Sequence, residues 1–167
     1  IQAAVIDSGI DSDHPALVGR VIAERCICSG GGGCCPGGGS NESGVGSGED
    51  DHGHGTNVSG IVGAGNIGAA VNPSRGVAPQ VELVAVKVLD SSNGFCCTSD
   101  VVAGLDWIVS DRLDVDVVNM SLGTFSLFAG DCDGLNAITL AFASAVNTLR
   151  ARGVLTTVSS MNNGSGT

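Results

Sequence analysis

The chain has 167 residues, of which 43% are hydrophobic and 14% are charged, and its formal net charge is −10. Such a chain can bury a core, so a disordered tail is excluded, and its length fits one domain or a piece of a larger one. Its 7 basic residues form no cluster, which makes nucleic acid a poor partner, and no apolar run reaches the ~20 residues of a membrane span.

The first expected element is a buried parallel strand, because the apolar residues 3–6 lead directly into Asp7-Ser8-Gly9. Open α/β sheets keep their chemistry at the carboxyl ends of their strands, so Asp7 is a candidate functional carboxylate. An aspartate that merely caps a turn is the alternative interpretation.

Residues 26–50 are rich in glycine, serine and cysteine, a composition that predicts a surface loop without packed elements. A high cysteine content favours disulfides and therefore a secreted, extracytoplasmic protein. The number is odd, which leaves one thiol free or paired outside the chain; the cysteines are Cys26, Cys28, Cys34, Cys35, Cys96, Cys97 and Cys132. A metal site of the first four is the weaker alternative, since the Cys-x2-Cys spacing of zinc sites is absent.

Two histidines, His52 and His54, precede an expected short helix over residues 56–64. The positive end of a helix disfavours the imidazolium and helps to keep a histidine neutral and able to accept a proton. We select His54 as the functional histidine because Gly-Thr follows it and because it lies nearer the helix. A metal site of Asp51, His52 and His54 is the alternative.

The glycines of residues 63–68 match the dinucleotide fingerprint G-x-G-x-x-G, and Asp90 follows roughly 20 residues later. The fingerprint needs a strand before it and a helix after it, but Pro73, Gly76 and Pro79 interrupt that helix. A glycine-rich loop is therefore the preferred interpretation.

Strands and helices alternate along the remaining chain. Apolar runs predict strands over residues 81–89, 115–120 and 154–158. Helices are predicted over residues 98–109, capped by Thr98 or Ser99, and over residues 136–150. This order is typical of an α/β fold with a mainly parallel sheet and right-handed crossovers.

Five segments together resemble the front part of the catalytic domain of a subtilase, a subtilisin-like serine protease. They occur in the order of the family: Val5-Ile6-Asp7-Ser8-Gly9, His54-Gly55-Thr56, Gly76-Val77-Ala78-Pro79, Asn119-Met120-Ser121-Leu122-Gly123 and the segment around Asn162. The resemblance implies a three-layer subtilisin-like α/β fold over residues 1–167, incomplete in this chain, with an insertion at about residues 26–50. The edge beside the last strand is then expected to be unpaired and apolar.

The resemblance also implies a serine-type endopeptidase that acts on protein or peptide substrates. Asp7 would orient the imidazole, His54 would act as general base and then general acid, and Asn162 would donate to the oxyanion. Backbone groups of Ser121, Leu122 and Gly123 would bind the extended substrate. The resemblance implies that this chemistry needs no cofactor and no metal. A structural calcium ion is left open, since the loop after Gly65 differs from the family's calcium loop. A propeptide is a further partner that the sequence leaves open.

The chain departs from the family pattern in three ways. Asn57 replaces a second histidine, and Met161 replaces the usual glycine before Asn162, where a side chain would narrow the pocket for the residue before the cleaved bond. No string resembles the nucleophile motif Gly-Thr-Ser-Met-Ala. We therefore predict that the parent protein is an endopeptidase and that this chain alone is an inactive fragment. The alternative is a non-catalytic subtilase-like module that binds peptides or scaffolds assembly.

Overall fold

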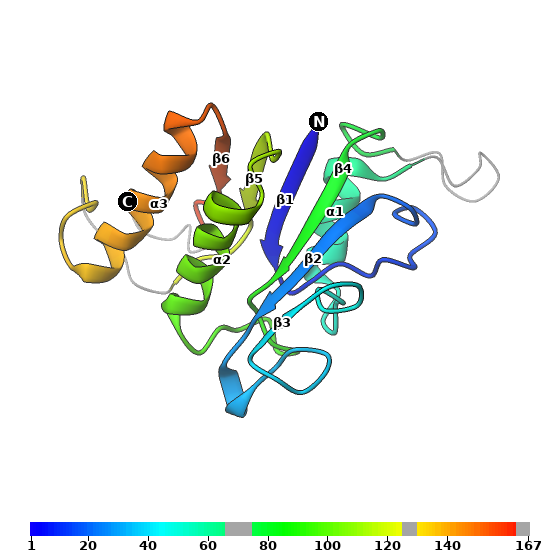
Figure 1. Cartoon of the computed structure of the whole chain (residues 1–167), viewed down its shortest axis with the longest axis horizontal. Coiled ribbons are helices and arrows are strands. Elements are labelled where there is room, and N and C mark those ends of the chain that lie inside the picture. The colour runs from blue at the N-terminus through cyan, green and yellow to red at the C-terminus, as the bar shows by residue number, and fades with distance from the viewer. Residues whose placement is uncertain (66–74, 125–129, 163–167) are drawn as a thin grey trace.

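A mainly parallel sheet forms the centre of the molecule. The computed structural model describes residues 1–65, 75–124 and 130–162 (Figure 1). Its described strands follow the order β3-β2-β4-β1-β5-β6, and every neighbouring pair is parallel except β2 with β3. The expected α/β fold class is therefore confirmed. The strands are β1 (Gln2–Asp7), β2 (Val21–Ile27), β3 (Asn41–Ser43), β4 (Glu82–Lys87), β5 (Val117–Met120) and β6 (Leu155–Val158).

Helices cover both faces of this sheet. Helices α2 (Thr98–Asp111) and α3 (Ala137–Ala151) lie on one face, and α1 (His54–Gly63) lies on the other (Figure 1). Successive side chains of a strand point to opposite faces, so Ala4 and Ile6 of β1 meet α2 and α3, whereas Ala3 and Val5 pack on the side of α1. This double coverage explains why β1 is a continuous apolar run.

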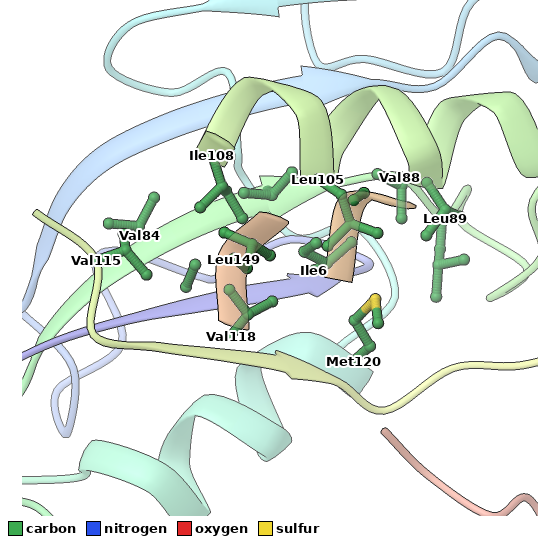
Figure 2. Close-up of a cluster of buried hydrophobic side chains, with 14 residues drawn as sticks. Ile6, Val84, Val88, Leu89, Leu105, Ile108, Val115, Val118, Met120 and Leu149 are labelled. Carbon is green, nitrogen blue, oxygen red and sulfur yellow. The ribbon is translucent and has the colours of Figure 1, made fainter. Parts of the chain in front are cut away.

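The larger core cluster lies between α2 and the sheet. Leu105 and Ile108 point from α2 toward Ile6, Val84 and Val118 on the strands (Figure 2). All five side chains are at most 1% exposed. Burial of side chains of this size stabilises the fold by about 1.5–3 kcal/mol each, which holds the strand ends in place.

The helix boundaries differ from the sequence expectations in two places. Helix α1 begins at His54 rather than Thr56, because Gly53 takes a left-handed conformation and starts the helix. The expected cap of α2 is wrong: Cys97 occupies the N-cap position without a side-chain hydrogen bond, and Thr98 is already helical. The third helix has a capping box, in which the Asn136 side chain accepts from the backbone of Ile138 and Thr139.

The expectation that residues 26–50 lack packed elements is wrong. Strand β2 runs into this segment and pairs with β4, and β3 adds an antiparallel strand, with a single 3₁₀ turn (Gly30–Gly32) between them. Strand β2 was not predicted because the charged residues Glu24 and Arg25 interrupt its run of apolar residues. Glu24 has a specific role, since its carboxylate accepts the backbone N–H groups of Gly46 and Gly48.

Disulfides bind the cysteine-rich segment together. Cys26 pairs with Cys35 and Cys28 with Cys34, so the alternative of a metal site at these four residues is wrong. The adjacent residues Cys96 and Cys97 form a third disulfide. All the cysteines lie in the described residues, and Cys132 is the one left unpaired. The odd thiol expected from the cysteine count is thus Cys132.

Strand β6 forms one edge of the described sheet. Its Leu155 and Val158 are 62% and 59% exposed, so this edge presents apolar side chains as well as backbone groups. None of the helices in the described ranges is long and apolar enough to cross a lipid bilayer.

Candidate active site

Three parallel strands bring the predicted site residues to one edge of the sheet. Strands β1, β5 and β6 are direct neighbours and run in the same direction. Their carboxyl ends therefore share an edge, where Asp7 ends β1, Ser121 follows β5, and the segment leading to Asn162 follows β6. Catalytic groups of open α/β sheets gather at this kind of edge.

A buried carboxylate contacts an imidazole at this edge. Oδ1 of Asp7 lies 2.7 Å from Nδ1 of His54, although 47 positions separate the two residues in the chain. The backbone N–H of Ser8 donates to the same oxygen. The Asp7 side chain is fully buried and the His54 side chain is 35% exposed. The carboxylate is thus held inside the protein while the imidazole reaches solvent.

This contact determines which nitrogen of His54 is available for chemistry. An ionised carboxylate can only accept hydrogen bonds, so the ring proton lies on Nδ1 and points at Asp7. The lone pair then lies on Nε2, on the far side of the ring. A histidine in this tautomer can take a proton at Nε2, and the adjacent carboxylate stabilises the imidazolium that results.

Two glycines allow α1 to approach the end of β1. A Cβ atom on Gly55, the residue after His54, would collide with the backbone oxygen of Gly9 and would lie 3.1 Å from Cβ of Asp7. Gly9 has a φ of 115°, and a Cβ there would meet the backbone of Gly48 and Glu49. The glycines of both motifs are therefore needed for close packing around the Asp7–His54 pair.

The alternative metal site of Asp51, His52 and His54 does not assemble. His52 is exposed, and its ring centroid lies 6.4 Å from that of His54. Asp51 instead contacts Lys87. Within the described parts of the chain, the one group of three ligand side chains close enough to share an ion is Cys96, Cys97 and Asp100, and two of these are joined in a disulfide.

The predicted substrate residues Ser121, Leu122 and Gly123 are partly exposed in the segment after β5. Leu122 and Gly123 line a cavity of about 540 Å³, whose wall is mainly apolar and includes Phe95 and Phe142. The segment of residues 121–123 is therefore partly exposed to solvent and lies beside an apolar cavity.

Asn162 is exposed, after β6, and Met161 before it has an unusual backbone. Met161 has a φ of 65°, a left-handed conformation that normally favours glycine. Its side chain lies against Gly123, where a Cβ atom would collide with the Met161 sulfur. The side chain at this position thus occupies the space between the segments after β5 and β6.

Sequence analysis did not identify Lys87, the single lysine of the chain, as a residue of this region. Its side chain is fully buried at the end of β4, opposite Asp7 in the strand register. Its ammonium donates to the backbone oxygens of Ser8 and Leu89, both at 2.8 Å, and to Asp51 at 2.6 Å. A buried cation therefore ties the end of β1 to the loop before α1.

We expect the Lys87→Met variant to lower the free energy of unfolding by about 2–4 kcal/mol, because two buried backbone oxygens lose their donor. Asp51 is 46% exposed and can regain water, which limits the loss. Urea unfolding of the protein that carries this chain measures the effect. The exposed Arg150→Met is the matched control, and equal stability of both variants would contradict the role given to Lys87.

Asp50 is a second residue that sequence analysis missed. Burial raises the pKa of its carboxyl group, but hydrogen bonds from Thr56, Gly53 and His52 outweigh this and lower the pKa from 3.8 to about 2. A lowered pKa in the folded state means that the ionised group stabilises the fold above pH 3.8 and loses this effect as the pH falls through about 2.

We therefore expect Asp50→Asn to destabilise the protein near neutral pH, and the difference from wild type to shrink between pH 4 and pH 2. Unfolding free energies measured across this range test the expectation. A difference that stays constant with pH would show that the charge of Asp50 is not involved.

The loop after Gly65, on which the question of a structural calcium ion depends, falls at residues 66–74, outside the described residues.

The arrangement of Asp7 and His54 has a known counterpart. Hydrolases that activate a hydroxyl nucleophile use a histidine oriented by a buried carboxylate as their general base. The chain belongs to the subtilase family, since the model of that family, peptidase family S8, matches residues 1–167.

Individual relatives agree with this assignment. The chain is 38% identical over 167 residues to the minor extracellular protease Epr of Bacillus subtilis (strain 168), covering 99% of this chain and 20% of the relative. It is 40% identical over 123 residues to subtilisin E of the same strain, covering 74% of this chain and 27% of the relative. The chain is 37% identical over 138 residues to an extracellular serine proteinase of Thermus sp. (strain Rt41A), and this match covers 83% of this chain and 28% of the relative.

A solved structure shows the same fold. The crystal structure of a cold adapted subtilisin-like serine proteinase matches with a TM-score of 0.64 and 28% identity, over 94% of this chain and 45% of that one. The subtilisin-like fold expected from the motifs is therefore confirmed. This chain spans roughly a fifth to under a third of the length of the relatives above.

Proposed function

We propose that this chain is the front part of the catalytic domain of a secreted serine endopeptidase. The observation that carries the proposal is the 2.7 Å contact between the buried Asp7 carboxylate and Nδ1 of His54. The disulfides support an extracytoplasmic location, as do two relatives whose names call them extracellular.

In the proposed mechanism, Nε2 of His54 removes the proton of a serine hydroxyl as its oxygen attacks the carbonyl carbon of a peptide bond. Asp7 stabilises the imidazolium, which then protonates the leaving amine. Water attacks the acyl-enzyme with His54 again as base, so that one peptide bond and one water yield an acid and an amine. These steps need no cofactor or metal.

Two further roles complete the proposed site. The side-chain amide of Asn162, which is exposed after β6, donates to the oxyanion. Backbone groups of Ser121, Leu122 and Gly123 pair with an extended peptide substrate. The cavity beside Leu122 and Gly123 supports a peptide with apolar side chains, and Met161 against Gly123 supports a small residue before the cleaved bond.

The nucleophilic serine is proposed to come from sequence beyond these 167 residues, which contain no Gly-Thr-Ser-Met-Ala string. The apolar edge that β6 forms in the described sheet supports this, because exposed Leu155 and Val158 would be covered by further parts of the domain. The same missing string favours a second candidate, a subtilase-like module that binds peptides without cleaving them.

The coding sequence beyond Thr167 and a serine-directed probe distinguish the two. We expect a Gly-Thr-Ser-Met-Ala-like string, and labelling of the full-length protein by a fluorophosphonate that is lost in His54→Ala. The 167-residue chain by itself should hydrolyse no casein above background. Another residue at the serine position, with peptide binding but no labelling, would establish the module instead. Robust casein hydrolysis by the short chain would refute the proposed origin of the serine.

A further inference from the structure

The carboxylate of Asp50 is the centre of a hydrogen-bond network next to the Asp7–His54 pair. Oδ1 accepts from the Ser8 hydroxyl at 2.9 Å and from the backbone N–H groups of His52 and Gly53 at 3.0 and 2.9 Å. Oδ2 accepts from the backbone N–H of Thr56 at 3.0 Å and from its hydroxyl at 2.5 Å. Asp50 thus binds groups both before and after His54.

The network also reaches the strand that carries Asp7. Ser8 directly follows Asp7, and its hydroxyl donates to Asp50 while it accepts the backbone N–H of Gly55 at 2.9 Å. The Thr56 hydroxyl likewise donates to Asp50 and accepts the backbone N–H of Asp11 at 2.9 Å. The Ser8 and Thr56 hydroxyls therefore form two bridges between the first turn of α1 and the segment that follows β1, and Asp50 accepts a hydrogen bond from each of these hydroxyls.

The start of α1 depends on these bridges. Gly53 at the N-cap position has no side chain to accept the free N–H groups of the first turn. Ser8 and Asp50 accept those of Gly55 and Thr56 in its place. A carboxylate at this end also interacts favourably with the helix dipole.

We propose that Asp50 is a positioning residue, which fixes the first turn of α1 on the end of β1 and so holds Nδ1 of His54 on the Asp7 carboxylate. The effect on catalysis rests on the function proposed above, but the effect on the hydrogen bond can be measured without turnover. Its lowered pKa keeps Asp50 ionised, and able to accept all five bonds, near neutral pH.

The test compares Asp50→Ala and Asp50→Asn with Asp116→Asn in the full-length protein. Asp116 is a matched control, since its carboxylate accepts a backbone N–H, that of Gln2, at the opposite edge of the sheet. We expect Asp50→Ala to lower kcat between 10- and about 10²-fold, the scale of a small misplacement of a catalytic group, with KM changed less than twofold. We also expect Asp50→Ala to lose the low-field proton NMR signal of His54 Nδ1–H. The kcat of Asp50→Asn should lie between those of wild type and Asp50→Ala.

The outcomes separate the two proposals. Loss of the low-field signal in folded Asp50→Ala supports the positioning role. If the wild-type protein cleaves no peptide, the proposed function fails, but this NMR result still supports the positioning role. A signal and a kcat equal to those of Asp116→Asn would overturn the role. If Asp50→Ala does not fold, Ser8→Ala decides, because it breaks one bridge and leaves four bonds of Asp50; an unchanged signal there would also overturn it.

Discussion

The Asp7→Asn variant of the full-length protein is expected to lose about 10⁴-fold in kcat while it remains folded. The same exchange has an effect of this size in a chymotrypsin-like protease, where the amide favours the wrong imidazole tautomer. Here the Asp7 carboxylate accepts from Nδ1 of His54 at 2.7 Å. An amide NH₂ in that position would donate to Nδ1, move the ring proton to Nε2 and remove the base.

Steady-state hydrolysis of a chromogenic peptide, with purified wild-type protein as reference, measures this loss. Asp116→Asn serves as the control for a change from aspartate to asparagine, since Asp116 lies at the amino end of β5. A loss below tenfold in folded Asp7→Asn protein would refute the assigned role of the carboxylate.

The second large effect is expected for Asn162→Ala, which should lower kcat roughly 10²–10³-fold and change KM little. This magnitude is the one known for the oxyanion asparagine of subtilisin, a member of the same family, and follows from the loss of a donor that acts mainly in the transition state. Asn162 is exposed after β6, so its replacement by alanine should leave the packing of the described residues unchanged.

Thermal unfolding of Asn162→Ala should therefore match wild type, and Asn41→Ala, an exposed asparagine of β3, provides the control for activity. An increase in KM without a fall in kcat would assign Asn162 to substrate binding rather than to the oxyanion.

The sequence alone determined two kinds of element: strands that are buried on both faces of the sheet, and helices that bury one apolar face. Strands β1, β4, β5 and β6 and helices α2 and α3 follow from local patterns of apolar residues, because such patterns record burial that is repeated along one segment. Asp7 and His54 could also be chosen from the sequence, because a short motif surrounds each of them. Their 2.7 Å contact was not predictable from spacing, because it depends on how α1 packs against β1.

Only the tertiary structure decided the features that depend on partners distant in the chain. Strand β2 contains Glu24 and Arg25 and becomes a strand because β4 and β3 satisfy its backbone. The pairing of four closely spaced cysteines is likewise set by how that segment folds. Asp50 and Lys87 are ordinary charged residues in the sequence. They gain their roles because folding removes water around them and supplies hydrogen-bond partners from up to 79 positions away.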